Sequence, residues 1–409
     1  MTDNKKILII GFVWPEPNSS AAGSRMMQLI AIFQQYNWHI TFASTAQNFE
    51  HSVNLVELNI STELLKLNSE TFDVFISELC PDFVLFDRFM VEEQFGWRVA
   101  RTCPNAMRIL DCEDLHCLRY ARQAALATLS IFKETDLLTE PSTLRELASI
   151  FRCDLSLIIS EHEIQLLQRL FKVNEDLLYY IPLFARVEDS MPTFIDRKDY
   201  IFIGNFLHLP NTDAVKFLKD EIWPIIRALQ PHVNLQIYGA YTPQKILQLH
   251  NPKEGFYING RAAIASTVVK SARVALAPIR FGAGMKGKLL EAMFCGTPSI
   301  TTAIGAEGMT SELLWNGIIA DTAEDIARAA VQLYTDEKLW LKSQRIGFKI
   351  IEDRHQLADY SAGFMARIFT VQSNLTSHRQ KNFTGAMLLH HTMRSTEYLS
   401  KWISEKNKA

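Results

Sequence analysis

The residues whose types and spacing suggest chemistry gather in one segment near position 290, APIRFGAGMKGKLLEAMFCGTPSITTAIGAEGM. A predicted strand runs into Gly282 and Gly284, and Lys286 and Lys288 follow at the start of a predicted helix. Glycines let the backbone approach a ligand closely, and a helix N-terminus offers free N–H groups with partial positive charge. Two lysines beside such groups predict a site for a phosphate-type anion. The alternative is a solvated basic turn.

Three further residues of this segment complete the predicted site. Arg280 stands at the strand end and adds a third cation. Glu291, one turn into the helix, can accept hydrogen bonds from a pair of sugar hydroxyls, although a surface carboxylate paired with a nearby lysine is the alternative. Glu307 lies in a second glycine-rich turn. The segment therefore predicts a nucleotide-sugar site, with the side chains of Arg280, Lys286 and Lys288 converging on one anion pocket.

A second turn, IFIGNFLHLPNTDAV, places Gly204, Asn205 and His208 between a strand and the following helix. We expect these residues to contact the donor from the strand end. Asn211 is a predicted N-cap for the helix, and the turn could equally be structural, as could His208.

A third segment, ILDCEDLHCLRYARQ, crowds ionisable groups directly after a strand, among them Asp114, His116, Arg119 and Arg122. Such crowding favours a functional site. Asp114 as a simple helix N-cap is the competing interpretation. His116 can orient a leaving phosphate or an acceptor hydroxyl. The residues expected to be catalytic are Asp114, His116 and Lys288.

The first loop, residues 12–26, contains Gly23, whose small size allows close approach at the next helix N-terminus. We expect this loop, together with Arg119, to belong to the site on the N-terminal side, where the loop could touch the donor phosphates or the acceptor. Neither a G-x-G-x-x-G fingerprint nor a P-loop is present in the sequence, and the missing fingerprint argues against a nicotinamide dehydrogenase.

Strand and helix patterns alternate along the 409 residues, which predicts an α/β protein with parallel sheets and more than one domain. We expect two Rossmann-like domains that face each other across a cleft, residues 1–184 and 199–354, with C-terminal helices at 355–409. Ligands in such sheets bind beyond the carboxyl ends of the strands. Strands are predicted at residues 5–12, 39–44, 82–87, 106–111, 153–160 and 177–182, then, after a polar linker at 185–198, at 200–205, 233–239, 255–260, 274–279, 298–302 and 317–321.

Composition excludes several classes of function. The formal charge of -3 provides no general attraction to nucleic acid. The six cysteines form no C-x-x-C pair, so we expect reduced and mostly buried thiols. Cys112 and Cys117 flank His116, but no fourth ligand has a suitable spacing, and we expect neither a metal nor a cofactor. Since no apolar run reaches membrane-spanning length, a cytoplasmic protein is expected, with only peripheral contact at the inner membrane face.

These three segments together make the chain resemble a bacterial glycosyltransferase of the GT-B fold, similar to glycosyltransferase family 4. The resemblance covers most of residues 5–370. It implies transfer of a sugar, with retention, from a UDP- or GDP-sugar held by the C-terminal domain, and C-terminal helices that cross back to the N-terminal domain. It also implies that Glu291 holds the donor ribose and that residues 282–284 lie near the diphosphate.

The chain departs from the pattern of that family at several positions. Ala283 stands where many members have a first glutamate, and Asn205 and Pro210 stand where they have an arginine and a lysine. Glu113 and Asp114 replace a frequent His-Asp pair. Arg280, Lys286 and Lys288 are the expected substitutes for the missing phosphate-binding cations.

Two other functions remain open from the residues alone, a sugar-nucleotide 2-epimerase and a non-catalytic glycosyltransferase-like subunit. The acceptor is also open among a glycan, a lipid-linked glycan and a protein side chain. The tail after residue 371 predicts a basic amphipathic helix, either packed or oligomer-forming, with membrane-surface attachment as the less favoured interpretation.

Overall fold

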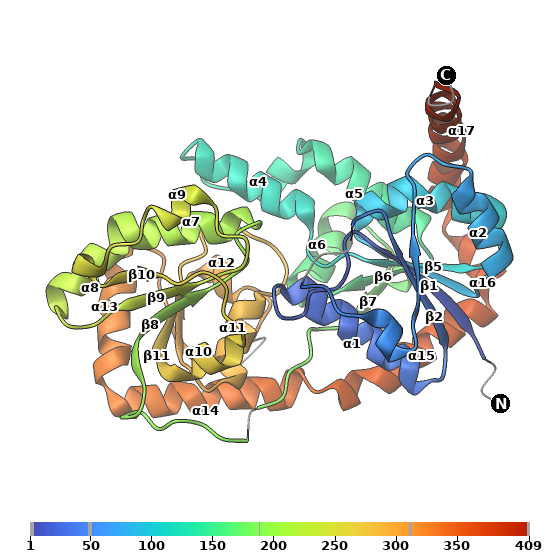
Figure 1. Cartoon of the computed structure of the whole chain (residues 1–409). Helices are drawn as coiled ribbons and strands as arrows, with labels where there is room; N and C mark the ends of the chain where they lie inside the picture. Colours follow the sequence, from blue (N-terminus) through green and yellow to red (C-terminus); the bar gives the residue numbers. More distant parts are fainter. Residues whose placement is uncertain (1–3, 48–50, 188, 311–312, 407–409) are drawn as a thin grey trace.

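A computed structural model describes residues 4–47, 51–187, 189–310 and 313–406. Two parallel sheets form the centres of two α/β domains, which confirms the predicted fold class (Figure 1). The seven strands of the N-terminal sheet lie in the order β3-β2-β1-β4-β5-β6-β7. Their bounds are β1 Lys6–Gly11, β2 His39–Ser44, β3 Ser61–Leu64, β4 Phe83–Asp87, β5 Met107–Asp111, β6 Leu155–Ile158 and β7 Leu178–Tyr180.

Alternating side chains of the N-terminal sheet enter two separate cores, because successive residues of a strand point to opposite faces. In β1, Leu8 and Ile10 belong to one core, and Ile7 and Ile9 belong to the other. Strands β4 to β6 are buried along their whole length, as expected for inner strands of a parallel sheet. The covering helices are α1 Ala21–Gln35, α2 Thr71–Leu79, α3 Phe89–Thr102, α4 His116–Ala127, α5 Pro141–Arg152 and α6 Glu161–Phe171.

The C-terminal sheet has six strands in the order β10-β9-β8-β11-β12-β13. They are β8 Lys198–Ile203, β9 Leu235–Tyr238, β10 Phe256–Ile258, β11 Ala272–Ala277, β12 Ser299–Thr301 and β13 Gly317–Ile319. The helices are α7 Leu209–Phe217, α8 Trp223–Leu229, α9 Gln244–Leu247, α10 Ala265–Ser271, α11 Gly287–Phe294, α12 Ala303–Ala306, α13 Ala323–Thr335 and α14 Glu337–Arg354.

The chain crosses back to the N-terminal domain directly after α14. Helix α14 buries Trp340 in the C-terminal core, whereas α15, Leu357–Ser373, buries Phe364 and Ile368 in the N-terminal core. Figure 1 shows α14 below the C-terminal sheet and α15 beneath the N-terminal one. At the crossing, the buried His355 ring contacts the Leu183 carbonyl oxygen through Nδ1 at 2.7 Å. This contact ties the crossing point to the linker between the domains.

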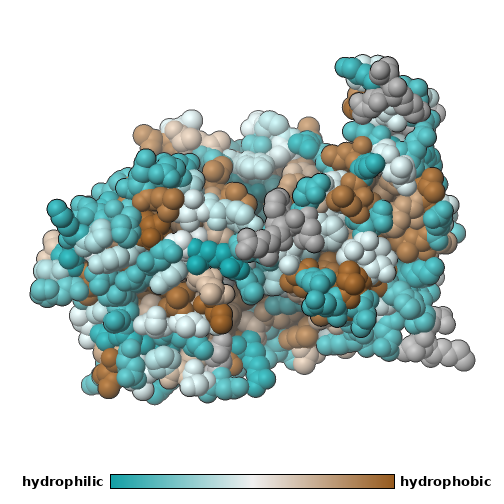
Figure 2. All heavy atoms as spheres, viewed as in Figure 1, coloured by the Kyte–Doolittle hydropathy of each residue, from teal (hydrophilic) through white to brown (hydrophobic). Residues whose placement is uncertain are grey.

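The tail forms two helices, α16 Leu375–Lys381 and α17 Phe383–Lys406. The side chain of Asn382 donates to the Phe151 carbonyl oxygen at 2.7 Å, and Arg98 Nη2 donates to Ser400 Oγ at 2.9 Å. Helix α17 thus packs on the N-terminal domain through α3 and α5. No helix in the described ranges is long and apolar enough to cross a membrane. On the face drawn in Figure 2, hydrophilic residues surround separate hydrophobic groups.

Several elements carry no prediction from the sequence, among them β3, α2, α5, α9, α10 and α12. The reason is clearest for β3, an edge strand whose four residues are all exposed and therefore show no apolar pattern. None of the six cysteines, all of which lie in the described ranges, forms a disulfide, and Cys112, Cys117, Cys153 and Cys295 are buried. This agrees with the expectation of reduced and mostly buried cysteines.

Candidate functional site

The N-termini of α1 and α11 meet where the two domains touch. A Cβ atom added to Gly287 would lie 2.5 Å from the Cβ atom of Ala21, so only glycine permits this approach. The first turn of α1 is capped by Ser20, whose Oγ accepts from the Gly23 N–H at 3.0 Å. Helix α11 begins after Lys286 and has no side-chain cap. Its free N–H groups therefore suit an anion at the domain boundary.

Lys288 and Glu291 lie three residues apart on α11, and each residue is half-buried. Within the described residues, neither side chain has a hydrogen bond or an ion pair to a protein group. Burial and the nearby charge of Lys286 lower the pKa of Lys288 to about 8, against the opposing effect of Glu291. Burial raises the pKa of Glu291 to about 7, against the opposing charge of Lys288. Enclosed polar groups without partners are the usual mark of a ligand site.

His208, in the turn after β8, lies within electrostatic reach of Lys288 on α11. Its side chain is exposed, but the surrounding protein desolvates it and lowers its pKa to about 4, against the opposing charge of Asp114. Lys288 and Arg119 also lower this pKa, which places His208 within electrostatic reach of both domains. The ring is therefore neutral near pH 7 and can act as an acceptor as well as a donor.

Asp114 is fixed by Arg119, with which it forms an ion pair. Burial alone would raise the pKa of Asp114, but the charges of Arg119, His116 and His208 outweigh it and hold the pKa well below its usual range. Leu115 occupies the N-cap position of α4, and no side chain caps this helix. The competing interpretation of Asp114 as the N-cap is therefore wrong. Asp114 is thus an ionised carboxylate held toward the C-terminal domain.

His116 lies beneath the domain boundary, with 4% of its surface exposed. Its Nδ1 contacts the backbone oxygen of Asp114 at 3.1 Å, and its backbone N–H donates to Glu146 Oε1 at 3.0 Å. Its ring also packs edge-on against Phe89. These contacts suit a residue that positions Asp114 better than one that touches a substrate.

Gly204 and Asn205 are held close to the N-terminal domain. A Cβ atom on Gly204 would lie 2.8 Å from the Asn211 side chain. The prediction that Asn211 caps α7 is wrong, because His208 occupies the N-cap position. Asn211 Nδ2 instead donates to the Asn205 backbone oxygen at 2.6 Å. Asn205 Nδ2 in turn donates to the Ser19 oxygen of the first loop at 3.2 Å. In that loop, Gly23 is required because a Cβ atom there would meet the Glu16 backbone at 2.4 Å.

Arg280 is engaged inside the C-terminal domain. Its Nε and Nη2 atoms donate to the two carboxylate oxygens of Asp213 on α7 at 2.9 and 2.6 Å, and its guanidinium lies over the Phe217 ring. The structure thus compensates the charge of Arg280 locally. We expected Arg280 to converge with Lys286 and Lys288 on one anion pocket; in the structure Arg280 is paired with Asp213, a carboxylate that the sequence pattern did not reveal.

Lys286 and Gly284 form part of the contact between the domains. Lys286 Nζ donates to the Gly284 oxygen at 2.8 Å, and burial lowers the pKa of Lys286 to about 8. The Gly284 N–H donates to Glu163 Oε1 on α6 at 2.7 Å. Gly284 has φ +61°, and a Cβ atom there would lie 2.7 Å from the Asp114 Cβ atom. Lys286 and Gly284 thus bring the loop before α11 against the N-terminal domain.

Glu307 also joins the domains. It forms two hydrogen bonds with Arg122 of α4, and His162 Nε2 lies 3.2 Å from Glu307 Oε2. Arg122 Nη1 donates as well to the Gly282 oxygen at 2.8 Å. Both oxygens of Glu307, which we expected to bind donor, are therefore occupied by the N-terminal domain in this structure.

Sequence reasoning missed three carboxylates of the site: Asp213, Glu146 and Glu163. Glu163 is buried, and burial together with Asp114 raises its pKa to about 8. A local signal existed only for Glu163, which follows a predicted strand end by a few residues. The parts of the chain that the structure describes contain no group of three or more His, Cys, Asp or Glu residues arranged to hold a metal ion.

Comparison with known proteins identifies the architecture. Residues 197–336, within the C-terminal domain, match the family model described as glycosyl transferases group 1. Among curated proteins none matches the chain significantly. Solved structures match over nearly the whole length, and their likeness assigns the GT-B fold.

Three of these structures illustrate the similarity. Sucrose-phosphate synthase from Thermosynechococcus elongatus shares 16% identity at a TM-score of 0.68, with 90% of this chain and 98% of that chain covered. HepE of Anabaena, in complex with UDP and glucose, shares 11% identity at a TM-score of 0.66, with coverage of 89% and 99%. A glycosyltransferase from Rickettsia africae shares 11% identity at a TM-score of 0.63, with coverage of 92% and 98%.

Proposed function

We propose that this protein is a glycosyltransferase that moves a sugar from a nucleotide-diphosphate-sugar to a hydroxyl acceptor. The observation that carries the proposal is the pair Lys288 and Glu291, half-buried and without a hydrogen bond or ion pair among the described residues. The pair lies beside the uncapped start of α11, where Gly287 meets Ala21 of the N-terminal domain. A nucleotide-sugar offers what both groups lack, a diphosphate for the cation and ribose hydroxyls for the carboxylate. The match of residues 197–336 to group 1 glycosyl transferases and the UDP-bound neighbours support the same assignment.

In the proposed reaction, negative charge develops on the departing diphosphate. The Lys288 ammonium and the N–H groups at the start of α11 stabilise this charge, and they are in place before the reaction starts. Arg280 and Lys286 do not contact the diphosphate in this proposal. They hold the loop between β11 and α11 in place through their contacts with Asp213 and the Gly284 oxygen. Because basic groups and a helix N-terminus meet the charge, we propose that neither a metal nor a cofactor is required.

On the N-terminal side, we propose that Asp114 and His208 lie closest to the reacting sugar and the acceptor, with Arg119 and His116 as positioning residues. Asp114 is ionised and His208 is neutral near pH 7, so the two can share a hydrogen bond with a hydroxyl group. The acceptor is a glycan, a lipid-linked glycan or a protein, within bacterial glycan or glycoconjugate synthesis. We further propose retention at the anomeric carbon.

The test begins with thermal melting of the purified chain in the presence of UDP, GDP and their common sugar conjugates. A ligand that binds only the folded protein raises its melting temperature. The conjugate that binds is then incubated with candidate acceptors, with and without EDTA, and NMR reports both transfer and anomeric configuration. Failure of every nucleotide to bind would overturn the proposal. Appearance of an epimer from donor alone would instead identify the 2-epimerase, and binding without turnover would identify a non-catalytic subunit.

A further inference from the structure

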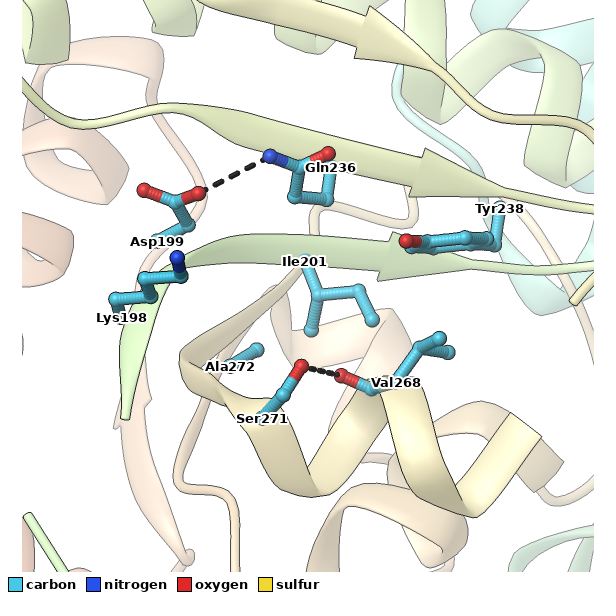
Figure 3. A pocket seen from close by; sticks show the side chains of 8 residues that line it. All are labelled: Lys198, Asp199, Ile201, Gln236, Tyr238, Val268, Ser271 and Ala272. Carbon is cyan, nitrogen blue, oxygen red and sulfur yellow. Dashed lines mark hydrogen bonds between the residues drawn. The ribbon is translucent and has the colours of Figure 1, made fainter. Parts of the chain in front are cut away.

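A polar depression of about 220 Å³ lies on the C-terminal domain between strands β8 and β9 and helix α10 (Figure 3). It extends toward the amino end of β8, where Lys198 and Asp199 stand, and thus away from the strand ends that carry Gly204 and His208. Its volume is below the roughly 300–1,000 Å³ of sites for drug-sized ligands, which suits a single ring unit. We call it the β8-β9 groove, lined by Lys198, Asp199, Ile201, Gln236, Tyr238, Val268, Ser271 and Ala272.

The groove exists because one face of this half of the sheet is left partly open. Parallel sheets are normally covered on both faces, and their strands are buried throughout. In β9 the buried Leu235 and Ile237 alternate with half-exposed Gln236 and Tyr238, and in β10 half-exposed Tyr257 lies between two buried residues. Strand pairing places Tyr257 opposite Gln236 on the open face. The open face therefore presents two aromatic rings and a chain of polar groups.

The polar groups of this face are fixed by one another. Gln236 Nε2 donates to Asp199 Oδ2 at 3.0 Å, and Asn259 Nδ2 donates to Gln236 Oε1 at 2.9 Å (Figure 3 shows the first contact). The backbone N–H and the side chain of Asn234 also donate to Asp199. The Asp199 carboxylate is thus occupied by its neighbours, whereas the fixed Gln236 amide keeps one N–H and one lone pair for a ligand.

Tyr238 supplies the apolar part of the groove. Figure 3 shows its ring lying alongside β8, with Val268 and Ser271 of α10 on the opposite wall. Its hydroxyl has no hydrogen bond in the described part of the chain. A half-exposed aromatic ring beside fixed planar polar groups provides one apolar surface and several hydrogen-bonding groups.

We propose that the β8-β9 groove binds a neutral saccharide. A sugar ring has an apolar face of C–H groups for Tyr238 and a rim of hydroxyls for Gln236 and Ser271. The lining carries one cation and one anion, Lys198 and Asp199, so it provides no net charge for a phosphate group or a nucleic acid. Polar side chains exclude a lipid tail. The choice of a saccharide rests on the proposed function, in which a glycan is acceptor or product, and the groove would hold a part of that glycan remote from the reacting end.

The test is saturation-transfer NMR and calorimetry with neutral trisaccharides of glucose, galactose, mannose and N-acetylglucosamine, in the presence of saturating UDP. At least one trisaccharide is expected to bind. Ser271→Arg, at an exposed helix position, should block the groove without touching the core and weaken binding at least tenfold. Tyr238→Ala should do the same, whereas Tyr238→Phe keeps the ring and should retain most of the affinity. Donor hydrolysis should be unchanged in Ser271→Arg.

The matched control is Lys288→Ala, which alters the domain boundary and should leave trisaccharide binding intact. Binding that survives Ser271→Arg, or that is lost in Lys288→Ala, would overturn the inference, as would absence of binding for all four trisaccharides. Self-association abolished by Ser271→Arg, measured by sedimentation, would assign the groove to a second copy instead. If UDP does not bind but Ser271→Arg still abolishes trisaccharide binding, the proposed function fails and the saccharide groove stands.

Discussion

Arg122 and Glu307 form a bidentate ion pair that joins the two domains, with Nη1–Oε1 and Nη2–Oε2 distances of 2.9 and 2.7 Å. The Arg122 side chain is 7% exposed and the Glu307 side chain 18%, so neither partner could be fully rehydrated if the other were removed. Because Arg122 also binds the Gly282 oxygen, the pair positions the loop that leads to α11.

Glu307→Ala should therefore destabilise the protein by about 3 kcal/mol, the cost of leaving a buried charge without its partner. Thermal and urea unfolding would measure the loss. The exposed pair of Arg169 with Glu134 offers a matched control, because Glu134→Ala should change stability little. An apolar double replacement, Arg122→Met with Glu307→Leu, should recover most of the stability. Equal effects of Glu307→Ala and Glu134→Ala would contradict the buried-pair interpretation.

Lys288→Ala should reduce sugar transfer by about 10²–10³-fold, by analogy with loss of one preorganised group that stabilises transition-state charge. Its melting temperature should change little, because the ammonium of Lys288 is half-buried and forms no ion pair among the described residues. Steady-state kinetics and circular dichroism would check both statements. Lys338→Ala, at an exposed position of α14, is the control with unchanged activity. Full activity in Lys288→Ala would remove this lysine from the proposed mechanism.

Glu291→Gln should stabilise the unliganded protein at pH 8 but not at pH 4.5. The pKa of Glu291 is about 7 in the folded protein, because burial raises it from 4.5 against the charge of Lys288. Between these pH values the folded state binds more protons than the unfolded state, so the free energy of unfolding falls as pH rises. Glutamine removes this penalty, which we expect to be roughly 1–3 kcal/mol after allowance for partial exposure.

Melting curves of both proteins across pH 4.5 to 8 would check this prediction, since their difference should grow with pH. The same substitution should weaken nucleotide binding in calorimetry, because an amide is a poorer acceptor for ribose hydroxyls than a carboxylate. Parallel melting curves at all pH values would argue against an enclosed ionisable Glu291. Unchanged nucleotide affinity would remove Glu291 from the donor site.

Gly287→Ala should push α1 and α11 apart, since its new Cβ atom would lie 2.5 Å from that of Ala21. Such overpacking typically costs about 1–3 kcal/mol. We expect lower stability and weaker binding of UDP, measured by melting and calorimetry. The exchange Ala21→Gly with Gly287→Ala keeps the total volume and should restore both properties. If the exchange variant is as unstable as Gly287→Ala and binds UDP as weakly, the contact between the starts of α1 and α11 is not the cause of either effect.

Much of the fold could be predicted because its signals are local. Inner strands such as β4 and β5 are short apolar runs bounded by polar residues, and helices such as α13 and α14 follow recognisable start signals. The string around Lys288 and Glu291 predicts an anion site from residue types that stand next to each other, and that prediction awaits the binding measurements above. Exposed β3 escaped prediction because a strand without a buried face has no apolar period.

The pairing of distant residues was decided by the tertiary structure alone. Arg122 and Glu307 are 185 positions apart, and Arg280 and Asp213 are 67 apart, so no local pattern connects them. Local residue types determined that cations gather near α11. The tertiary structure determined which of them are paired, as Arg280 is with Asp213 of the same domain, and which have no ion pair among the described residues, as Lys288 does not. The physical reason is that desolvation and ion pairing depend on all atoms around a group, and most of those atoms come from remote parts of the chain.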